Sequence, residues 1–316
     1  MTEYNNNQME QFITGEPDSV SRLASHQDNP SLHGNYNQRH RAKAVVSTLL
    51  AFVLSTVLVL LTVLVIVQAT LLNDQYMKTQ VDKSNYVTLV KDEIDNSFIS
   101  YGQSSGFEES FFSGKVTDLD LRQDLVSELN KLYNPNSSGA NVDKFRTDIY
   151  VSMIDYAKAQ GDEITPEVDE AVSYLADLCK ETYRLEVTTP FTTQLYTALH
   201  KLQGLMIFGF IGIGLLFLVV IAFLLGVHKK KYRAVPYVSY SFLSAGLVLL
   251  VASLVVLFSN IIGRLGILNK PLYELVTTYI ENIFVMTIWA AGFFIIFAIL
   301  IAIIYLNTLR HRRRTR

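Results

Sequence analysis

The sequence predicts an all-α integral membrane protein with four transmembrane helices and an extracellular helical bundle. Four stretches of at least 23 residues lack Asp, Glu, Lys, Arg and His altogether. Hydrophobic residues make up 50% of the 316-residue chain and charged residues only 18%, whereas about a quarter of the residues in soluble domains are charged. Between the first two apolar stretches lies an acidic segment whose apolar residues recur at helical spacing, which indicates a folded helical domain.

The four spans are predicted at 44–72, 205–227, 235–262 and 283–306. A transmembrane helix needs about 20 apolar residues, and each stretch exceeds that length. A charge at the bilayer centre costs about 2.5–3.5 kcal/mol, so four charge-free stretches indicate membrane insertion. The first stretch follows 43 residues and is too long for the apolar part of a signal peptide. We therefore expect it to remain in the protein as a signal anchor.

Basic residues near the span ends predict the orientation, because cytoplasmic loops carry an excess of Lys and Arg. Twelve lie on one side of the membrane, and five lie near the span ends on the other. The sequence thus predicts a multi-pass plasma-membrane protein with both termini in the cytoplasm. Its predicted parts outside the spans are a disordered cytoplasmic tail at 1–43, an extracellular all-α domain at 73–204, a basic cytoplasmic loop at 228–234, a short extracellular loop with an amphipathic helix at 263–282 and a basic cytoplasmic tail at 307–316.

The cytoplasmic basic clusters have two interpretations that can hold together. They can act only as topology signals, or they can also contact anionic lipid head groups, since juxtamembrane basic residues contribute about 1 kcal/mol each at such a surface. The possible lipid-contacting residues are Lys229, Lys230, Lys231, Arg233, Arg310, Arg312, Arg313 and Arg314.

The segment 73–204 holds 22 acidic and 12 basic residues and shows four apolar stripes at three- and four-residue steps, a spacing typical of amphipathic helices. Thr117 or Asp118 is a plausible N-cap of the second helix, Gly161 a C-cap of the third, and Thr165-Pro166 the start of the fourth. Phe191–Gln203 is expected to run into the second span. The stripes are Tyr86, Leu89, Val90, Ile94 and Phe98; Leu121, Leu125, Leu129 and Leu132; Val142, Phe145, Ile149, Met153 and Tyr156; and Val168, Val172, Leu175, Cys179 and Tyr183.

No catalytic, cofactor-binding or metal motif stands out, so the sequence predicts no enzyme, no cofactor and no metal site. Asp118, Asp120 and Asp124 resemble part of a calcium loop but lack its Gly and its terminal Glu. His200 is expected to be a surface residue, and Cys179 a small buried hydrophobe. As the chain has one cysteine, no disulfide can form within it. Asn136-Ser137-Ser138 fits a glycosylation acceptor, which matters only in a eukaryotic secretory pathway.

Transporters and ion channels typically place ionisable residues within their spans. The four predicted spans contain no Asp, Glu, Lys, Arg or His. Their polar groups are Ser, Thr and Gln, including four serines of the third span. Gly209, Gly212 and Gly214 of the second span would permit close helix packing. Ordinary helix packing accounts for these residues, although a pore formed by oligomerisation is an open alternative.

The stretch Gln68-Ala69-Thr70-Leu71-Leu72-Asn73, followed by Tyr76, Val81, Asn85-Tyr86 and Leu89, resembles a recurring opening in multi-pass membrane proteins of Gram-positive bacteria. In those proteins a first span passes into a helical extracellular domain, which three further spans and a basic tail follow. The resemblance implies a cell-envelope location and no particular activity.

Two functions from different classes fit these features. The first is a non-catalytic sensor, scaffold or partner-binding subunit of the cell envelope, whose partners would be other membrane or envelope proteins or a second copy of the chain. The alternative is a transport or channel component that handles lipid or another apolar cargo. Neither function involves nucleic acid.

Overall fold

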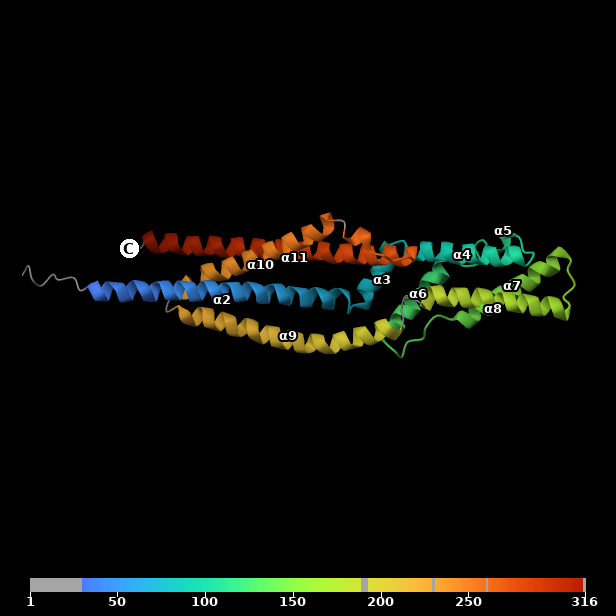
Figure 1. Ribbon diagram of the computed structural model, residues 1–316, viewed down its shortest axis with the longest axis horizontal. Coiled ribbons are helices and arrows are strands. Elements are labelled where there is room, and N and C mark those ends of the chain that lie inside the picture. Colours follow the sequence, from blue (N-terminus) through green and yellow to red (C-terminus); the bar gives the residue numbers. More distant parts are fainter. Residues whose placement is uncertain (1–29, 189–192, 229–230, 260, 315–316) are drawn as a thin grey trace, which may run out of the picture. The chain divides into compact units, whose positions relative to one another are not determined.

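The structure, a computed structural model, describes residues 30–188, 193–228, 231–259 and 261–314 (Figure 1). These ranges contain helices, turns and loops but no strand, which confirms the all-α class. The chain divides into two compact units, 1–49 and 50–316, and the tertiary packing described below lies within the second. The helices are α2 (Pro30–Thr70), α3 (Asp74–Lys83), α4 (Tyr86–Ser104), α5 (Glu109–Phe112), α6 (Asp118–Tyr133), α7 (Val142–Gln160), α8 (Pro166–Thr188), α9 (Thr193–Val227), η4 (Lys231–Arg233), α10 (Val235–Phe258), η5 (Ile262–Arg264) and α11 (Lys270–Arg314).

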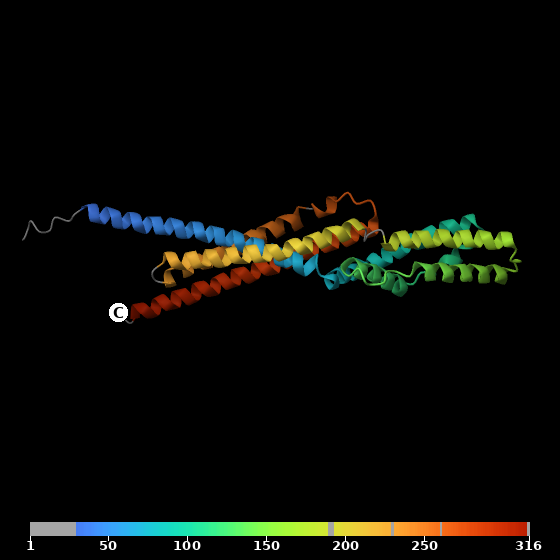
Figure 2. The ribbon, with the colours of Figure 1, turned by 90° about the horizontal axis from the view of Figure 1, so that it is seen from below.

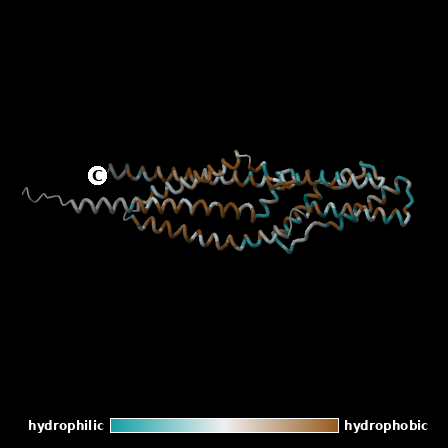
Figure 3. The backbone as a smooth tube through the Cα atoms, in the orientation of Figure 1, coloured by the Kyte–Doolittle hydropathy of each residue, from teal (hydrophilic) through white to brown (hydrophobic). Residues whose placement is uncertain are grey.

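Four helices of the described residues are long and apolar enough to cross a membrane, and Figure 3 shows their hydrophobic stretches in brown. The qualifying segments are Lys43–Thr70, Leu195–Val227, Val235–Phe258 and Lys270–Arg310. Each overlaps one predicted span. The third helix ends at Phe258, before the predicted limit at 262, and the next described helix is η5 at Ile262–Arg264.

Large apolar side chains are exposed on the outer faces of these four helices. Phe208 on α9 is 76% exposed, Phe258 on α10 84% and Trp289 on α11 77%. Burying such a side chain away from water is worth about 1.5–3 kcal/mol, so a whole helix face of this kind is unfavourable in water. Contact with lipid acyl chains removes that cost, and the four helices are therefore consistent with a multi-pass membrane protein.

Helices α10 and α11 lie side by side in both views (Figures 1 and 2), and a glycine of α10 lies close to the α11 backbone. A Cβ atom built on Gly246 would lie 3.0 Å from the Ala291 carbonyl oxygen and 2.9 Å from the Ile295 side chain. Of the glycines predicted for this role, Gly209 faces α2, since a Cβ atom built on it would lie 3.5 Å from the Leu64 side chain. A Cβ atom built on Gly212 or Gly214 would meet nothing within 4 Å. Close packing thus occurs mainly at a glycine of the third span that the prediction omitted.

Two serines of α10 donate hydrogen bonds to the backbone of neighbouring helices. The Ser239 hydroxyl donates to the Ala298 carbonyl oxygen of α11 at 2.8 Å, and that of Ser241 donates to the Ala51 carbonyl oxygen of α2 at the same distance. Both serines are buried. Interhelical bonds of this kind are worth about 0.6 kcal/mol each in membrane proteins. These hydroxyls therefore hold helices together, as ordinary packing requires.

Helices α3 to α8 form a bundle, residues 74–188, around one hydrophobic core. The predicted stripes supply most of that core, which confirms their helical spacing. From α4 come Tyr86, Val90, Ile94 and Phe98, while α6 contributes Leu121, Leu125 and Leu129. From α7 come Ile149 and Met153, and from α8 Val172, Leu175, Cys179 and Tyr183.

Helix ends in the bundle follow local rules that the sequence shows. The Thr117 hydroxyl accepts a hydrogen bond from the Asp120 backbone N–H at 3.1 Å, so Thr117 is the N-cap of α6. Gly161 ends α7 with φ of 93°, a left-handed conformation that glycine adopts without strain. Pro166 begins α8 as predicted. Gly102 lies within α4, against the Phe112 ring.

Helix α11 links the bundle to the fourth span as one continuous helix. Its 45 residues extend about 68 Å, against a hydrocarbon thickness of about 30 Å. Leu275, near its start, belongs to the bundle core. The Asn282 side chain donates a 2.7 Å hydrogen bond to the side-chain oxygen of buried Gln80 on α3. The predicted short amphipathic helix at 263–282 is therefore, from Lys270 onward, the first part of α11.

The predicted disordered tail at 1–43 lies mostly outside the described residues. From Pro30 onward the chain is helical, so α2 begins well before the predicted span. The prediction relied on the absence of an apolar stripe. Strong helix formers near the span, such as Gln38, Arg39 and Ala42, extend a helix at little cost once the membrane segment has formed it.

Candidate functional site: two clefts in the helical bundle

The larger cleft, which we call the hairpin cleft, lies where α7 turns into α8. Its volume is about 740 Å³. The α4–α5 loop at 105–108 forms one wall, and the end of α7 with the first half of α8 forms the rest. The lining residues are Ser105, Gly106, Phe107, Glu108, Tyr156, Ala157, Gln160, Asp162, Glu163, Val168, Ala171, Val172 and Leu175.

Aromatic packing holds the α4–α5 wall of the hairpin cleft in place. The Phe107 ring stacks on Tyr156 of α7 with 5.6 Å between ring centroids. Behind it, Phe111 packs against the same tyrosine at 4.8 Å. Gly106, with φ of 83°, lets the chain turn back toward α7 after α4 ends. The cleft therefore has a preformed wall, as small-molecule and peptide sites generally have.

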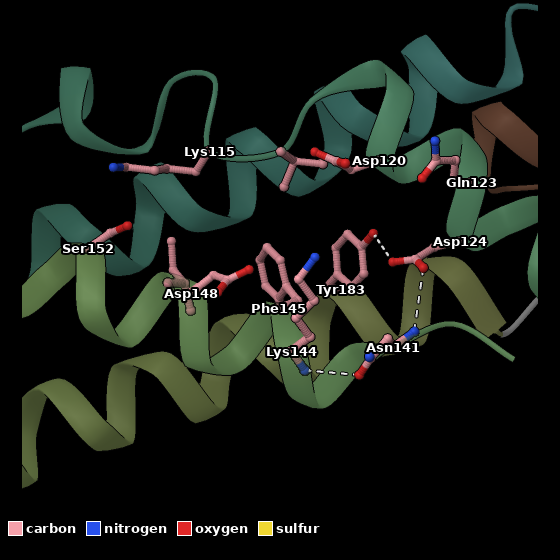
Figure 4. Close-up of a pocket in the computed structure, with 12 residues that line it drawn as sticks. Lys115, Asp120, Gln123, Asp124, Asn141, Lys144, Phe145, Asp148, Ser152 and Tyr183 are labelled. Atoms are coloured by element: carbon pink, nitrogen blue, oxygen red, sulfur yellow. Dashed lines mark hydrogen bonds between the residues drawn. The ribbon is translucent and has the colours of Figure 1, made fainter. Parts of the chain in front are cut away.

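A second cleft, of about 310 Å³, opens between α6 and α7, and we call it the α6–α7 cleft. Both helices pack on α8. Figure 4 shows the side chains of the cleft. Asp120, Gln123 and Asp124 project from α6, while Lys144, Phe145, Asp148 and Ser152 come from α7 and Asn141 is the N-cap residue of α7. Tyr183 of α8 lies at the base, stacked on Phe145 with 4.2 Å between ring centroids. Lys115 lines the cleft from the loop before α6.

Several polar groups of the α6–α7 cleft bond to other groups of the protein. The Tyr183 hydroxyl donates to Asp124 at 2.7 Å, and the Asn141 backbone N–H donates to the other oxygen of the same carboxylate at 3.4 Å. Burial of Tyr183 and its bond to Asp124 raise the pKa of the tyrosine well above its ordinary value. The Lys115 ammonium lies 4.3 Å from the Phe111 ring centroid. These contacts join α6 to α7 and α8, which indicates a structural role for this cleft.

The residues weighed as possible ligands do not form a metal site. In the part of the chain that the structure describes, no group of three His, Cys, Asp or Glu side chains is close enough to hold a metal ion. Asp118 and Asp120 lie in the first turn of α6, where carboxylates favour the helix dipole. His200 is exposed, with its Nδ1 3.1 Å from the Tyr196 carbonyl oxygen. Asn136 lies in an exposed turn.

Cys179 is fully buried in the bundle core, as predicted. Burial raises the pKa of its thiol to about 12. Because the thiolate is the reactive form, this cysteine should not react in the folded protein.

The structure describes only part of the predicted lipid-contacting set. Arg233 and Arg310 are exposed at or near the ends of η4 and α11. Lys231 lies in η4, and Arg312, Arg313 and Arg314 lie in the last turn of α11. Lys229 and Lys230 lie outside the described residues. Lipid contact by these residues stays a prediction.

A half-buried carboxylate near the end of α8 makes stability depend on pH. Burial, and secondarily the negative charge of Glu93, raise the pKa of Glu186 above its ordinary value of 4.5. The folded protein therefore binds this proton more tightly than the unfolded chain, and stability falls as pH rises through the interval from 4.5 to the raised pKa.

We expect Glu186→Gln to stabilise the bundle at pH 7 by less than about 1 kcal/mol, since solvent screens a half-exposed charge. Thermal unfolding of the full-length protein at pH 7 and pH 4 measures this effect. The gain should disappear at pH 4, where the wild-type carboxyl is protonated. An equal gain at both pH values would show that the carboxylate charge is not the cause.

Comparisons with known proteins give no family for this chain: no family model, no curated protein and no solved structure matches it. The resemblance to multi-pass proteins of Gram-positive bacteria thus stays a prediction.

The sequence pattern did not reveal the hairpin cleft. Its two walls come from residues near 107 and near 168, and only a tertiary contact brings them together. Phe111 and Phe112, which follow the α4–α5 loop, are both buried.

Proposed function

We propose that this chain is a non-catalytic receptor subunit of the cell envelope. In this proposal the bundle of α3 to α8 lies outside the plasma membrane and binds a partner. Both termini lie in the cytoplasm, on the side that carries most of the basic residues near the span ends. A sensor and a partner-binding scaffold both fall within this role.

The continuity of α11 is the observation that carries the proposal. One helix contributes Leu275 to the bundle core, passes Asn282 bonded to Gln80, and continues along α10 to the basic cluster after Arg310. A change in the bundle that moves the start of a continuous helix also displaces its far end, because the backbone hydrogen bonds make it stiff. Binding outside the membrane can thereby alter what the inner end contacts.

The orientation can be tested with single cysteines, because the native Cys179 is buried and unreactive. We would introduce Ser138→Cys in the bundle and Asn307→Cys after the fourth span, and label intact cells with a membrane-impermeant maleimide. The proposal expects labelling of the first variant in intact cells and of the second only after permeabilisation. The reverse pattern would place the bundle in the cytoplasm and overturn the proposal.

Partner binding can be tested by photocrosslinking in native membranes. Leu119, Val151 and Tyr174 are large exposed side chains on α6, α7 and α8, each 49–67% exposed. A photoreactive amino acid at these positions should yield a protein adduct of defined mass from at least one face of the bundle. Phe208, on the apolar face of α9, is the matched control for contacts within the bilayer. Bundle positions that give no adduct in native membranes would argue against a receptor role.

A further inference from the structure

We propose that the hairpin cleft binds a short peptide segment that carries both apolar and basic side chains. This inference rests on the proposed receptor function and names the chemistry of its partner. Nothing in the sequence pattern assigned a role to this cleft, since its walls come from α7, α8 and the loop between α4 and α5.

The base of the cleft is apolar and suited to apolar side chains. Val172 and Leu175 of α8 form it together with Ala157 of α7, and all three are buried in the bundle. Phe107 and Tyr156 are only partly buried and flank this base. An apolar side chain that entered here would gain about 25 cal/mol for each Å² it removes from water. The stacked aromatic pair gives the base a fixed shape, which limits the entropy lost on binding.

The rim of the cleft carries charge of one sign. Glu108, Asp162 and Glu163 are exposed acidic residues in its lining, and none of the lining residues is Lys, Arg or His. Glu108 enters from the α4–α5 loop, and Asp162 and Glu163 enter from the α7–α8 turn, so the carboxylates lie on both walls. Three carboxylates of this kind attract a cationic ligand and increase its association rate, more strongly at low salt.

The size of the cleft favours a peptide over a single ion or a small amine. Its volume of about 740 Å³ lies in the upper part of the range for drug-sized ligands, about 300–1,000 Å³. A segment of three or four residues is of that size. It can place apolar side chains on the base and basic side chains at the rim, which a compact cation cannot do. The α6–α7 cleft is less suited to such a peptide, because it is smaller and because its lining contains lysines as well as carboxylates.

The test uses full-length protein in a non-ionic detergent and fluorescence anisotropy with three labelled tetrapeptides. Each probe carries fluorescein on its N-terminal amine. They are fluorescein-Lys-Leu-Phe-Lys-amide, its counterpart with Glu in place of both Lys, and its counterpart with Ser in place of Leu and Phe. The first should bind at least tenfold more tightly than either of the others. Equal binding of the first and third would show that charge alone attracts the peptide, and would overturn the proposal.

Variants of the protein locate the binding. Glu108→Gln, Asp162→Asn and Glu163→Gln together should weaken binding of the first peptide at least tenfold. The matched control neutralises three exposed acids outside the cleft, Asp92→Asn, Asp155→Asn and Glu170→Gln, with the same change in net charge. The control should retain the wild-type affinity within a factor of about two. Equal loss in both triple variants would show binding to the general negative charge of the bundle, against the proposal.

A third variant keeps the charge and fills the space. Ala171→Phe, at an exposed position of α8 that lines the cleft, should reduce peptide binding at least tenfold without changing the net charge. Circular dichroism and thermal unfolding would show that this variant is folded. Unchanged binding would place the peptide elsewhere. Failure of the receptor proposal can be distinguished from failure of this inference, because photocrosslinking at Leu119, Val151 and Tyr174 does not depend on this cleft.

Discussion

Replacing Phe112 with alanine should destabilise the bundle by about 3–5 kcal/mol, the usual cost of removing a buried phenylalanine ring. Phe112 is fully buried, and its ring packs against Phe98 of α4 and against Phe107 and Phe111, with centroid separations of 4.9–6.3 Å. Helix α5, which carries it, has only four residues and cannot be stable by itself. Chemical denaturation of the full-length protein in detergent, followed by near-ultraviolet circular dichroism, measures the loss.

The same substitution should also open the hairpin cleft. Phe107, part of its wall, is held by Phe112 and Phe111 as well as by Tyr156. Without the Phe112 ring the loop at 105–108 loses one of its contacts with the core. Limited proteolysis should then cut the chain in this loop at conditions where the wild-type protein is intact. Resistance equal to wild type would show that Phe111 and Tyr156 suffice to hold the wall.

Gly102 provides an internal control for the Phe112 prediction. A Cβ atom on Gly102 would lie 2.0 Å from Cε2 of the Phe112 ring, so Gly102→Ala should cost about 1–3 kcal/mol through overpacking. In the Phe112→Ala background that ring is gone, and the added methyl should instead stabilise α4, because alanine is the better helix former by about 1 kcal/mol. A cost of equal size in both backgrounds would contradict the packing explanation.

The apolar stripes of the bundle could be predicted because they depend on local periodicity. Ile94 and Phe98 are four residues apart on one helix, and so are Leu121 and Leu125, and any amphipathic helix must bury such a stripe. The Thr117 cap and the Gly161 end likewise follow from interactions within a few residues. The spans were predictable because the exclusion of charge over more than 20 residues is itself a local signal.

Features that depend on distant residues were not predictable. Gly246 permits close packing because Ala291 and Ile295 lie opposite it. Gly212 and Gly214 are also glycines of a predicted span, but no atom of another helix lies within 4 Å of where their Cβ would be. No rule of spacing separates these cases, since each depends on which helix face meets another. The hairpin cleft also needs the fold of the α4–α5 loop, which follows from the burial of Phe111 and Phe112 against other helices. A single sequence does not show which of its distant residues contact one another.

The second large effect is expected where the bundle meets the fourth span. Asn282→Leu should destabilise the protein by about 1–3 kcal/mol, because the side-chain oxygen of Gln80, a residue only 1% exposed, loses its hydrogen-bond donor. The partners are 202 residues apart in sequence, and their bond joins α3 to α11. Chemical denaturation measures the loss.

A double-mutant cycle separates this bond from a general packing defect. Gln80→Met combined with Asn282→Leu removes both polar groups and should recover most of the lost stability, since a matched apolar pair leaves no unsatisfied oxygen. The single variants and the double variant should therefore show a coupling energy of about 1 kcal/mol or more. Strictly additive losses would mean that the two side chains contribute independently, and that the bond seen between them carries little energy.

The cooperativity of unfolding connects this bond to the receptor proposal. If α11 transmits changes from the bundle, the bundle and the part of α11 that contacts it should unfold together in the wild-type protein, because Leu275 of α11 lies in the bundle core and Asn282 bonds to Gln80 of α3. In Asn282→Leu the bundle should become protease-sensitive at lower denaturant concentrations, while the α10–α11 pair, held at Gly246 and Ser239, stays protected. The opposite result would be that the bundle and α11 already unfold in separate transitions in the wild-type protein and that Asn282→Leu shifts neither transition. The bundle and α11 would then not be coupled, and α11 could not transmit a change from the bundle.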